Sequence, residues 1–250
     1  MGEGALQGKI AYVTGGSCGI GRATALCFAE AGADVAICHL GDADQAASLV
    51  QAVAARGRRA FAAEADVASP AATRAFAAAA EAALGPCDIL VNNAGINLRG
   101  PFESITEEIY DRVVDVHLKG MFFMAQAVYA GMVARGHGRI INIASQMALK
   151  GGPNATPYCS AKAGIIGFTR GLAWEAAPKG VLVNAIAPGP IDTDLNRDRV
   201  EWRKMMVETL PIGRLGKVEE IAATALMLAG PGGDYYVGAT LSPNGGDIMY

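Results

Sequence analysis

The chain has 250 residues, of which 52% are hydrophobic and 18% charged, and its formal net charge is −3. This composition can fill a large core and excludes an intrinsically disordered chain. Basic residues do not gather beyond Arg56, Arg58 and Arg59, which argues against a nucleic-acid partner. No apolar run reaches the roughly 18–20 residues that span a bilayer, and residues 1–8 lack a signal-peptide pattern. The sequence therefore predicts a cytoplasmic protein with no membrane partner.

Cysteine and histidine are too scattered to indicate a structural cross-link or a metal site. The five cysteines form no CxxC pair, and the three histidines, His39, His117 and His137, lie far apart in the sequence. Disulfide frameworks and zinc sites use paired, closely spaced ligands. We expect reduced thiols and no bound metal.

Apolar segments alternate with helical ones along the whole chain. Short apolar runs predict strands at 9–14, 34–38, 59–63, 89–91, 139–144, 181–187 and 239–242. The segments between them predict helices at about 21–31, 44–56, 69–85, 106–134, 158–176 and 218–228, with Ser69 and Thr106 as N-caps.

The fold class follows from the strands, which are apolar throughout instead of alternating with polar residues. Such strands belong to a parallel sheet that helices cover on both faces. We predict one doubly wound, Rossmann-type α/β domain over residues 1–250, with about seven strands. Residues 190–216 carry charges, prolines and glycines without a regular pattern. Because they follow a strand end, where ligands bind in such sheets, they are a candidate substrate lid.

A glycine-rich turn joins the first predicted strand to the first helix. It reads Thr14-Gly15-Gly16-Ser17-Cys18-Gly19-Ile20-Gly21. Glycines allow positive φ values and a close approach of the backbone to a ligand, and the following helix N-terminus favours a phosphate. An ordinary tight turn is the alternative interpretation.

Tyr158 and Lys162 lie four residues apart on a predicted helix and therefore share one face. An ammonium near a phenol favours the phenolate and lowers the phenol pKa, as a general acid/base requires. The same spacing also occurs on solvated helix faces. Ser145, thirteen residues before Tyr158, follows the strand at 139–144 and would reach the same edge of the sheet.

These motifs together resemble the short-chain dehydrogenase/reductase family. The TGxxxGxG turn, Asn92-Asn93-Ala94-Gly95, Ser145 and the YxxxK pair occur in the family's order, and the resemblance covers residues 8–246. It implies an NAD(P)-dependent oxidoreductase that moves a hydride between nicotinamide and a carbonyl or secondary alcohol. It further implies that Tyr158 handles the proton, Lys162 holds the nicotinamide ribose and Ser145 binds the substrate oxygen.

One position departs from the family pattern. The family carries an asparagine in its long helix, in a water-linked proton path behind the lysine, where this chain has His117. Histidine also donates and accepts hydrogen bonds and titrates near neutrality. We expect His117 to replace the asparagine in this path. A space-filling role, or a weakened path, is the alternative.

The resemblance also implies the cofactor contacts. They are Gly15, Ser17, Cys18, Gly19, Ile20, Gly21, His39, Leu40, Asp66, Val67, Asn93, Ala94, Gly95, Tyr158, Lys162, Pro188, Gly189, Ile191 and Thr193. NAD-selective relatives place an acidic residue at position 39, and NADP-selective ones a basic residue at 18 or 40. The chain has neither. The lack of a carboxylate removes repulsion of a 2′-phosphate, which His39 could contact, so NADP(H) is slightly favoured and NAD(H) or dual use stays open.

A small molecule is the expected substrate, and Asn97, Gln146, Met147 and Asn154 are candidates for its pocket. A sugar, polyol or ketone is favoured. A 3-oxoacyl-[acyl-carrier-protein] reductase is the alternative, although Gly136 and Trp174 stand where such relatives present basic residues, with Arg135 and Arg139 nearby. A cofactor-binding sensor or scaffold without catalysis is an alternative from another class. The resemblance also implies a homotetramer.

Overall fold

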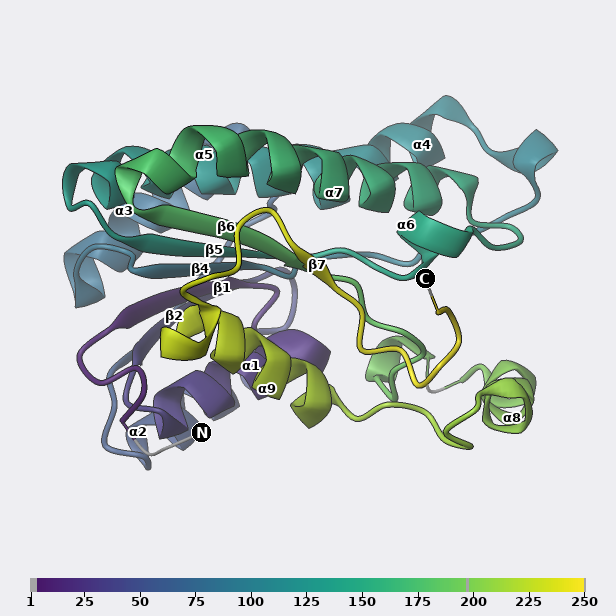
Figure 1. Ribbon diagram of the computed structural model, residues 1–250, viewed down its shortest axis with the longest axis horizontal. Helices are drawn as coiled ribbons and strands as arrows, with labels where there is room; N and C mark the ends of the chain where they lie inside the picture. The colour runs from purple at the N-terminus through teal and green to yellow at the C-terminus, as the bar shows by residue number, and fades with distance from the viewer. Residues whose placement is uncertain (1–3, 197, 250) are drawn as a thin grey trace.

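The computed structural model describes residues 4–196 and 198–249, and its centre is a seven-stranded parallel sheet (Figure 1). The spatial order of the strands is β3-β2-β1-β4-β5-β6-β7. Their bounds are β1 Ile10–Thr14, β2 Asp34–His39, β3 Ala60–Glu64, β4 Ile89–Asn92, β5 Gly138–Ile143, β6 Val181–Ile186 and β7 Thr240–Leu241. All pairs are parallel, which confirms the predicted fold class.

Helices cover both faces of the sheet, as Figure 1 shows. The helices α1 (Gly19–Glu30), α2 (Ala43–Ala54) and α9 (Val218–Ala229) lie on one face, where the strands bury one core cluster with them. On the other face α3 (Pro70–Leu84), α5 (Gly120–Ala134) and α7 (Thr156–Ala176) enclose a second cluster. Burial of both strand faces is why the strands are apolar throughout.

The chain order creates a switch point at the middle of the sheet. From β1 the chain builds outward to β2 and β3, then returns to place β4 on the other side of β1. The connections that leave the carboxyl ends of β1 and β4 therefore diverge to opposite faces. Sheets of this kind bind ligands in the crevice between such connections.

The helix predicted at 106–134 is interrupted. Thr106 caps α4 (Glu107–Val114), its hydroxyl oxygen accepting from the Ile109 amide at 3.4 Å. A π-helical turn at Asp115–Lys119 then joins α4 to α5. Such bulges widen the helix locally and are frequent at functional sites. His117 lies within this turn and is buried.

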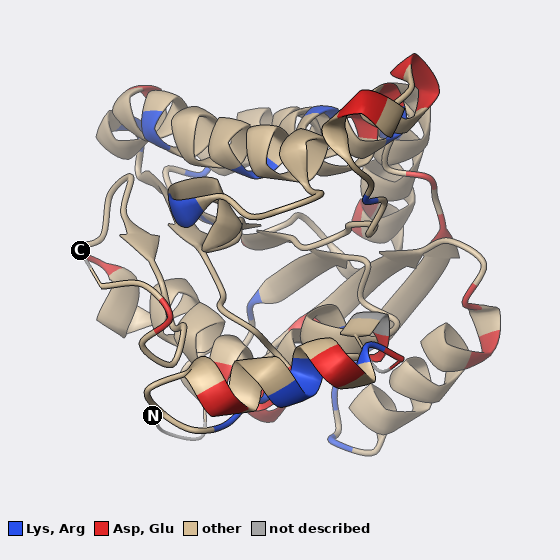
Figure 2. Ribbon diagram, turned by 90° about the vertical axis from the view of Figure 1, so that its right-hand side faces the viewer, with Lys and Arg blue, Asp and Glu red and all other residues tan. Residues whose placement is uncertain are grey.

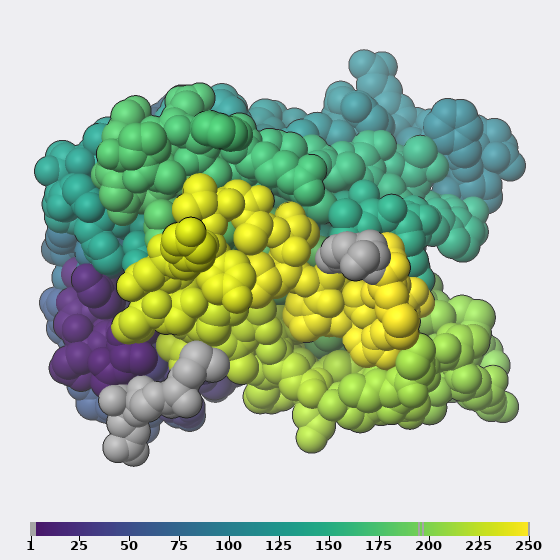
Figure 3. Space-filling view, viewed as in Figure 1, coloured from purple at the N-terminus to yellow at the C-terminus, as the bar shows by residue number. Residues whose placement is uncertain are grey.

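Several short elements were not predicted. The region 190–216 contains α8 (Val200–Thr209) and the 3₁₀ turn Asp194–Asn196, while Arg197 lies outside the described residues. A one-turn helix α6 (Met147–Lys150) follows β5. The remaining 3₁₀ turns are Phe102–Ser104, Ala177–Lys179 and Pro231–Gly233. Figure 3 shows the C-terminal segment, in yellow, spread over one face of the molecule beside α9. No helix within the described parts of the chain is long and apolar enough to cross a membrane.

The glycine-rich turn leaves no space for side chains at Gly15, Gly16 and Gly21. Gly15 has φ +60°, and a Cβ on it would lie 2.9 Å from the Ala94 Cα. A Cβ on Gly21 would lie 2.2 Å from the Gly15 carbonyl oxygen. The start of α1 therefore packs directly on the turn that precedes it.

We predict that Gly21→Ala destabilises the fold by about 1–3 kcal/mol, because the new methyl group overlaps backbone that cannot move freely. The matched control is Gly131→Ala in α5, where the Cβ would meet only the flexible end of Arg135 at 3.3 Å. That substitution should be neutral or stabilising by up to about 1 kcal/mol. Urea unfolding of both variants measures this, and equal stabilities would contradict the tight contact.

Candidate functional site

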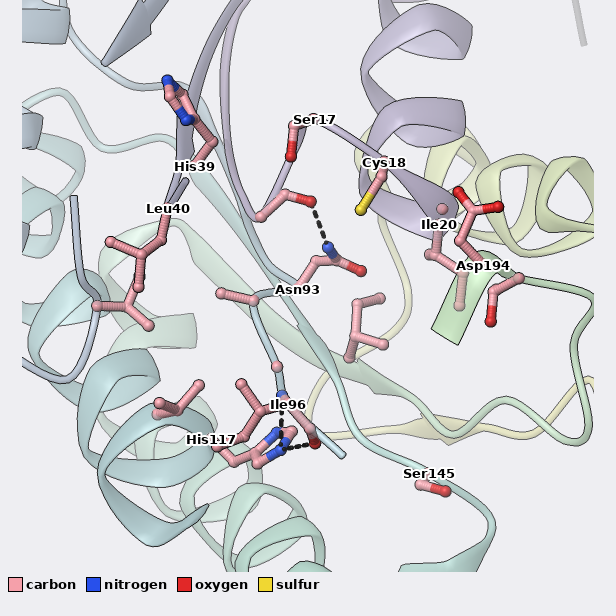
Figure 4. Close-up of a pocket in the computed structure, with 18 of the residues that line it drawn as sticks. Ser17, Cys18, Ile20, His39, Leu40, Asn93, Ile96, His117, Ser145 and Asp194 are labelled. Carbon is pink, nitrogen blue, oxygen red and sulfur yellow. Dashed lines mark hydrogen bonds between the residues drawn. The ribbon is translucent and has the colours of Figure 1, made fainter. Parts of the chain in front are cut away.

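A cavity of about 370 Å³ opens at the switch point, along the carboxyl ends of β1, β2 and β4. Figure 4 shows His39 and Leu40 at one end of it and Ser145 at the other, with Ser17, Cys18 and Asn93 between them. The predicted cofactor residues that line it are Gly15, Ser17, Cys18, Gly19, Ile20, His39, Leu40, Asp66, Val67, Asn93, Ala94, Gly95, Tyr158, Lys162, Pro188, Gly189, Ile191 and Thr193.

Gly21 is the predicted contact that does not line this cavity. Its small size serves packing instead, since a Cβ would also lie 2.5 Å from the Asn93 side-chain nitrogen. The sequence interpretation missed several lining residues, among them Asp42, Arg112 and Asn196. Each lies outside the matched motifs, so no local signal marked it.

Hydrogen bonds join the two strand ends that border the cavity. The Asn93 side-chain amide donates to the carbonyl oxygens of Thr14 at 3.1 Å and Gly15 at 3.0 Å. The Thr14 hydroxyl oxygen accepts from the backbone amides of Asn93 and Ala94, both at 3.0 Å. The side chain of the N-cap residue Cys18 makes no capping bond, so it does not compete for the amides at the N-terminus of α1. This cradle fits a dinucleotide pyrophosphate.

Charged groups line the end of the cavity near His39 and Leu40, where the adenosine part of a dinucleotide would bind. The Ser17 hydroxyl donates to the Asp42 carboxylate at 3.1 Å, just beyond the end of β2. Asp66 forms an ion pair with Arg112 at 2.8 Å, so that guanidinium is already neutralised. Among the described lining residues, no other Arg or Lys stands at this end. Position 39 carries no acidic residue, and Asp42 supplies a carboxylate to the lining of the same cavity.

Ser145 and Tyr158 lie where this cavity meets a second one, since both residues line both. Ser145 follows β5 by two residues, at the predicted strand end, and its hydroxyl accepts from the Met147 amide at 3.1 Å. Burial raises the pKa of Tyr158 above its ordinary value, and a hydrogen bond with Ser145 and the positive charge of Arg99 oppose that rise. The sequence interpretation expected the pKa to fall because of Lys162. The structure gives the other direction, because burial outweighs the hydrogen bond with Ser145 and the charge of Arg99.

Lys162 is buried below Tyr158, with its Nζ 5.7 Å from the centre of the tyrosine ring. Its ammonium donates to the Ile143 carbonyl oxygen at 2.6 Å, and no carboxylate of the described residues pairs with it. Burial lowers the pKa of Lys162 to about 7. This amine therefore gains and loses its proton close to neutral pH.

His117 packs edge-on against Tyr158, with ring centres 5.2 Å apart. Its Nε2 lies 2.9 Å from the Ile96 carbonyl oxygen and 3.2 Å from the Ile96 amide nitrogen, so it donates to the former in one tautomer and accepts from the latter in the other (Figure 4). Burial, aided by the charge of Lys162, lowers the pKa of His117 to about 3. Titration near neutrality, which the sequence interpretation allowed, is therefore wrong, and the ring acts as a neutral donor and acceptor.

A small cavity of about 10 Å³ lies behind Lys162 and His117. Two side-chain atoms of residues in its lining, Asn92 Oδ1 and His117 Nδ1, are buried without a partner among the described residues. That volume is about the lower limit for one water molecule.

The second cavity, of about 660 Å³, lies between α6 and α8. Figure 2 faces this side of the molecule and shows basic and acidic residues along α8. All four predicted substrate residues, Asn97, Gln146, Met147 and Asn154, line it. Side chains of α8 form one wall, and the movement of residues 190–216 as a lid stays a prediction. The sequence interpretation missed four charged lining residues, Arg99, Lys150, Arg199 and Asp247.

Arg135 and Arg139, considered for carrier-protein binding, lie at the opposite edge of the sheet, where β5 begins. Arg135 donates to the Cys87 carbonyl oxygen, and Arg139 pairs with Asp234 at 2.5 Å. Both guanidiniums are therefore engaged away from the two cavities.

A doubly wound sheet with a dinucleotide-sized cavity at its switch point, ending at a tyrosine and a lysine, defines the class of nicotinamide-dependent oxidoreductases. Residues 9–204 match the short chain dehydrogenase family. The chain is 40% identical to the (2S)-[(R)-hydroxy(phenyl)methyl]succinyl-CoA dehydrogenase subunit BbsD of Thauera aromatica, over 98% of both chains. It is also 40% identical to the acetoacetyl-CoA reductase of Shinella zoogloeoides, over 96% of this chain and 99% of that one.

Comparison with solved structures supports the same family. A blue fluorescent protein from a metagenomic library, in complex with NADPH, superposes with a TM-score of 0.94 and is 42% identical, covering 98% of this chain and 100% of its own. The chain belongs to the short-chain dehydrogenase/reductase family and is an NAD(P)-dependent oxidoreductase that acts on CH–OH groups.

The buried amine predicts a pH-dependent stability. In the unfolded chain Lys162 keeps its proton up to its ordinary pKa of 10.5, but in the fold only up to about 7. Between these values the unfolded chain binds more protons, so this group makes the fold more stable as pH rises, and its full cost is present below pH 7. Relative to Lys162→Met, the wild type should gain about 1–3 kcal/mol from pH 7 to pH 9. Urea unfolding at stepped pH measures the difference, and parallel stability curves would contradict it.

Proposed function

We propose that the chain reduces the 3-oxo group of an acyl thioester, or oxidises the matching alcohol, with NADP(H) as the favoured cofactor. The observation that carries this proposal is that Ser145 and Tyr158 line both the dinucleotide cavity and the second cavity. A carbonyl at this junction can contact both hydroxyls. The nicotinamide, when bound, supplies or accepts the hydride.

In this proposal each side chain handles a proton or a developing charge. Ser145 donates a hydrogen bond to the substrate oxygen and stabilises negative charge on it. Tyr158 donates its proton to that oxygen in reduction and accepts it in oxidation. Its raised pKa suits the donor role, since the neutral phenol persists at working pH. Lys162, with its pKa near 7, can supply the next proton and holds the nicotinamide ribose.

We propose that the proton path behind Lys162 includes the small cavity. One water molecule there would contact Lys162 and could satisfy the Nδ1 of His117, whose Nε2 is held by Ile96. His117 would then replace the family's asparagine by orienting this water as a neutral ring. The steric alternative leaves its Nδ1 unsatisfied, which is costly in a buried site.

The substrate class rests on the relatives as well as on the cavity. The sequence favoured a sugar, polyol or ketone, but one relative is named for reducing acetoacetyl-CoA and another for dehydrogenating a substituted succinyl-CoA. The second cavity is large enough for an acyl chain, and α8 borders it. Both points support a thioester over a sugar.

Tyr158→Phe tests the reaction directly. The variant keeps the ring but loses the transferable proton, so kcat should fall about 100-fold to 10,000-fold while NADPH binding is retained. Turnover of acetoacetyl-CoA is followed by nicotinamide absorbance, and cofactor binding by calorimetry. If the wild type binds NADPH tightly but turns over no thioester, ketone, sugar or polyol, a cofactor-binding sensor is the better assignment.

Asp42→Asn tests the cofactor preference. NADP(H) is supported by the NADPH-bound structural relative and by the missing carboxylate at position 39. The Asp42 carboxylate repels a 2′-phosphate and should leave NAD(H) usable. Removing its charge should raise the kcat/KM ratio of NADPH over NADH about tenfold. Asp44→Asn, on the same helix but outside the cavity, is the control, and equal ratios in both variants would exclude this role of Asp42.

We also propose a homotetramer. On α5, Phe122 is 43% exposed, and its ring centre lies 5.4 Å from that of Phe168 on α7. Trp174, also on α7, is 86% exposed. Met121 and Val128 instead point into the core. Light scattering should give four times the chain mass of 25.7 kDa, and Phe122→Glu should lower it. A monomeric mass for the wild type would disprove this assembly.

A further inference from the structure

The second cavity is positively charged, although the whole chain is negative. Arg99, Lys150 and Arg199 are the cationic side chains among its described lining residues, and Asp247 is the anionic one. Asp247 is already paired with Lys150 at 2.6 Å and accepts from Gln146. Two arginines therefore remain without a carboxylate partner in the part of the chain that the structure describes.

Arg99 is positioned beside the reacting group. Its Nε donates to the Asn97 side-chain oxygen at 2.6 Å, and its Cζ lies 5.6 Å from the centre of the Tyr158 ring. Among the described residues, the guanidinium otherwise makes one hydrogen bond, with the Met147 sulfur at 3.6 Å. These contacts orient the Arg99 guanidinium, while most of its N–H groups remain available to bind a ligand.

Arg199 comes from the other wall, at the residue before α8. Its guanidinium stacks on Trp202 with Cζ 4.6 Å from the ring centre, and it makes one long contact, 3.5 Å, with Asn196. Stacking fixes the plane of the guanidinium without using its donors. The positive charge of Arg99 helps to lower the pKa of Arg199, after the larger effect of burial. The two guanidiniums therefore repel each other, and an anion bound between them would reduce this repulsion.

We propose that Arg99 and Arg199, the arginine pair, bind a carboxylate on the acyl skeleton of the substrate, so that the preferred substrate is a dicarboxylic 3-oxoacyl thioester or its alcohol. This rests on the proposed function. Arginine forks match carboxylates through paired, charge-assisted hydrogen bonds. The phosphates of coenzyme A are the other source of negative charge. They are separated from the thioester by the whole pantetheine arm, whereas Arg99 lies over the Tyr158 ring, so a carboxylate close to the reacting carbon fits better.

The test compares two substrates that differ at one group, a charged carboxylate in one and its neutral methyl ester in the other. These are the N-acetylcysteamine thioester of 3-oxoadipic acid, which carries a carboxylate and no phosphate, and the methyl ester of the same compound. The wild type should prefer the free acid in kcat/KM, and Arg199→Gln and Arg99→Gln should each lose about tenfold to hundredfold on the acid with little change on the ester. Arg203→Gln, on α8 but paired with Asp192 and outside this cavity, should leave both values unchanged.

Three outcomes would overturn the proposal. The wild type could show no preference for the acid. The arginine variants could lose equally on acid and ester, which indicates a structural role. They could also impair acetoacetyl-CoA but not its N-acetylcysteamine analogue, which would assign the pair to a phosphate.

A binding measurement separates this proposal from the proposed function. Adipate should bind to the NADPH-loaded wild type in calorimetry and at least about tenfold more weakly to Arg199→Gln. Adipate binding without turnover of any 3-oxoacyl thioester would leave the arginine pair standing and refute the thioester reaction. Turnover of acetoacetyl-CoA without adipate binding would support the thioester reaction and refute the carboxylate-binding role of the arginine pair.

Discussion

The burial of the Lys162 ammonium is the constraint on which the site depends. The amine lies in the core below Tyr158, and its hydrogen bond is to the last backbone carbonyl of β5, Ile143. Burial destabilises the charged form of the amine relative to the neutral form, and the pKa of Lys162 falls to about 7 as a result. The same buried charge helps to keep the His117 ring neutral. A group that is expensive to bury is thereby kept ready to exchange a proton at neutral pH.

The two cavities divide binding between backbone and side chains. The dinucleotide cavity is built from strand ends, a glycine turn and the amides of α1, whose positions are fixed by the sheet. The second cavity is built from the segment after β4, the short helix α6, α8 and the C-terminal segment. Under the proposed function, the cofactor side thus depends on backbone that the fold fixes, whereas the substrate side depends on side chains of loops and short helices.

The sequence predicted the fold and the motif residues because both are local in the chain. Uniformly apolar strands, the glycine turn and the YxxxK spacing each show within about ten residues, and the structure places Ser145 and Tyr158 together as expected. The π-helical turn was not predicted, because a one-residue widening leaves no mark on hydrophobic periodicity. Arg99 and Arg199 are a hundred positions apart in loop regions, so only the fold brings them to one cavity. The pKa of His117 depends on its depth in the core, which its neighbours in sequence do not reveal.

The ion pair between Asp247 and Lys150 makes the C-terminal segment part of the wall of the second cavity. Asn244 holds the same segment by donating to the Ile248 carbonyl oxygen at 3.0 Å, so residues 244–248 form a compact turn against α6 (Figure 1). An affinity tag joined behind this turn would leave directly from the wall of the second cavity, whereas an N-terminal tag would join the segment in which the Leu6 amide donates to the Ala31 carbonyl oxygen, just after α1. Recombinant protein for substrate screening is therefore best tagged at its N-terminus.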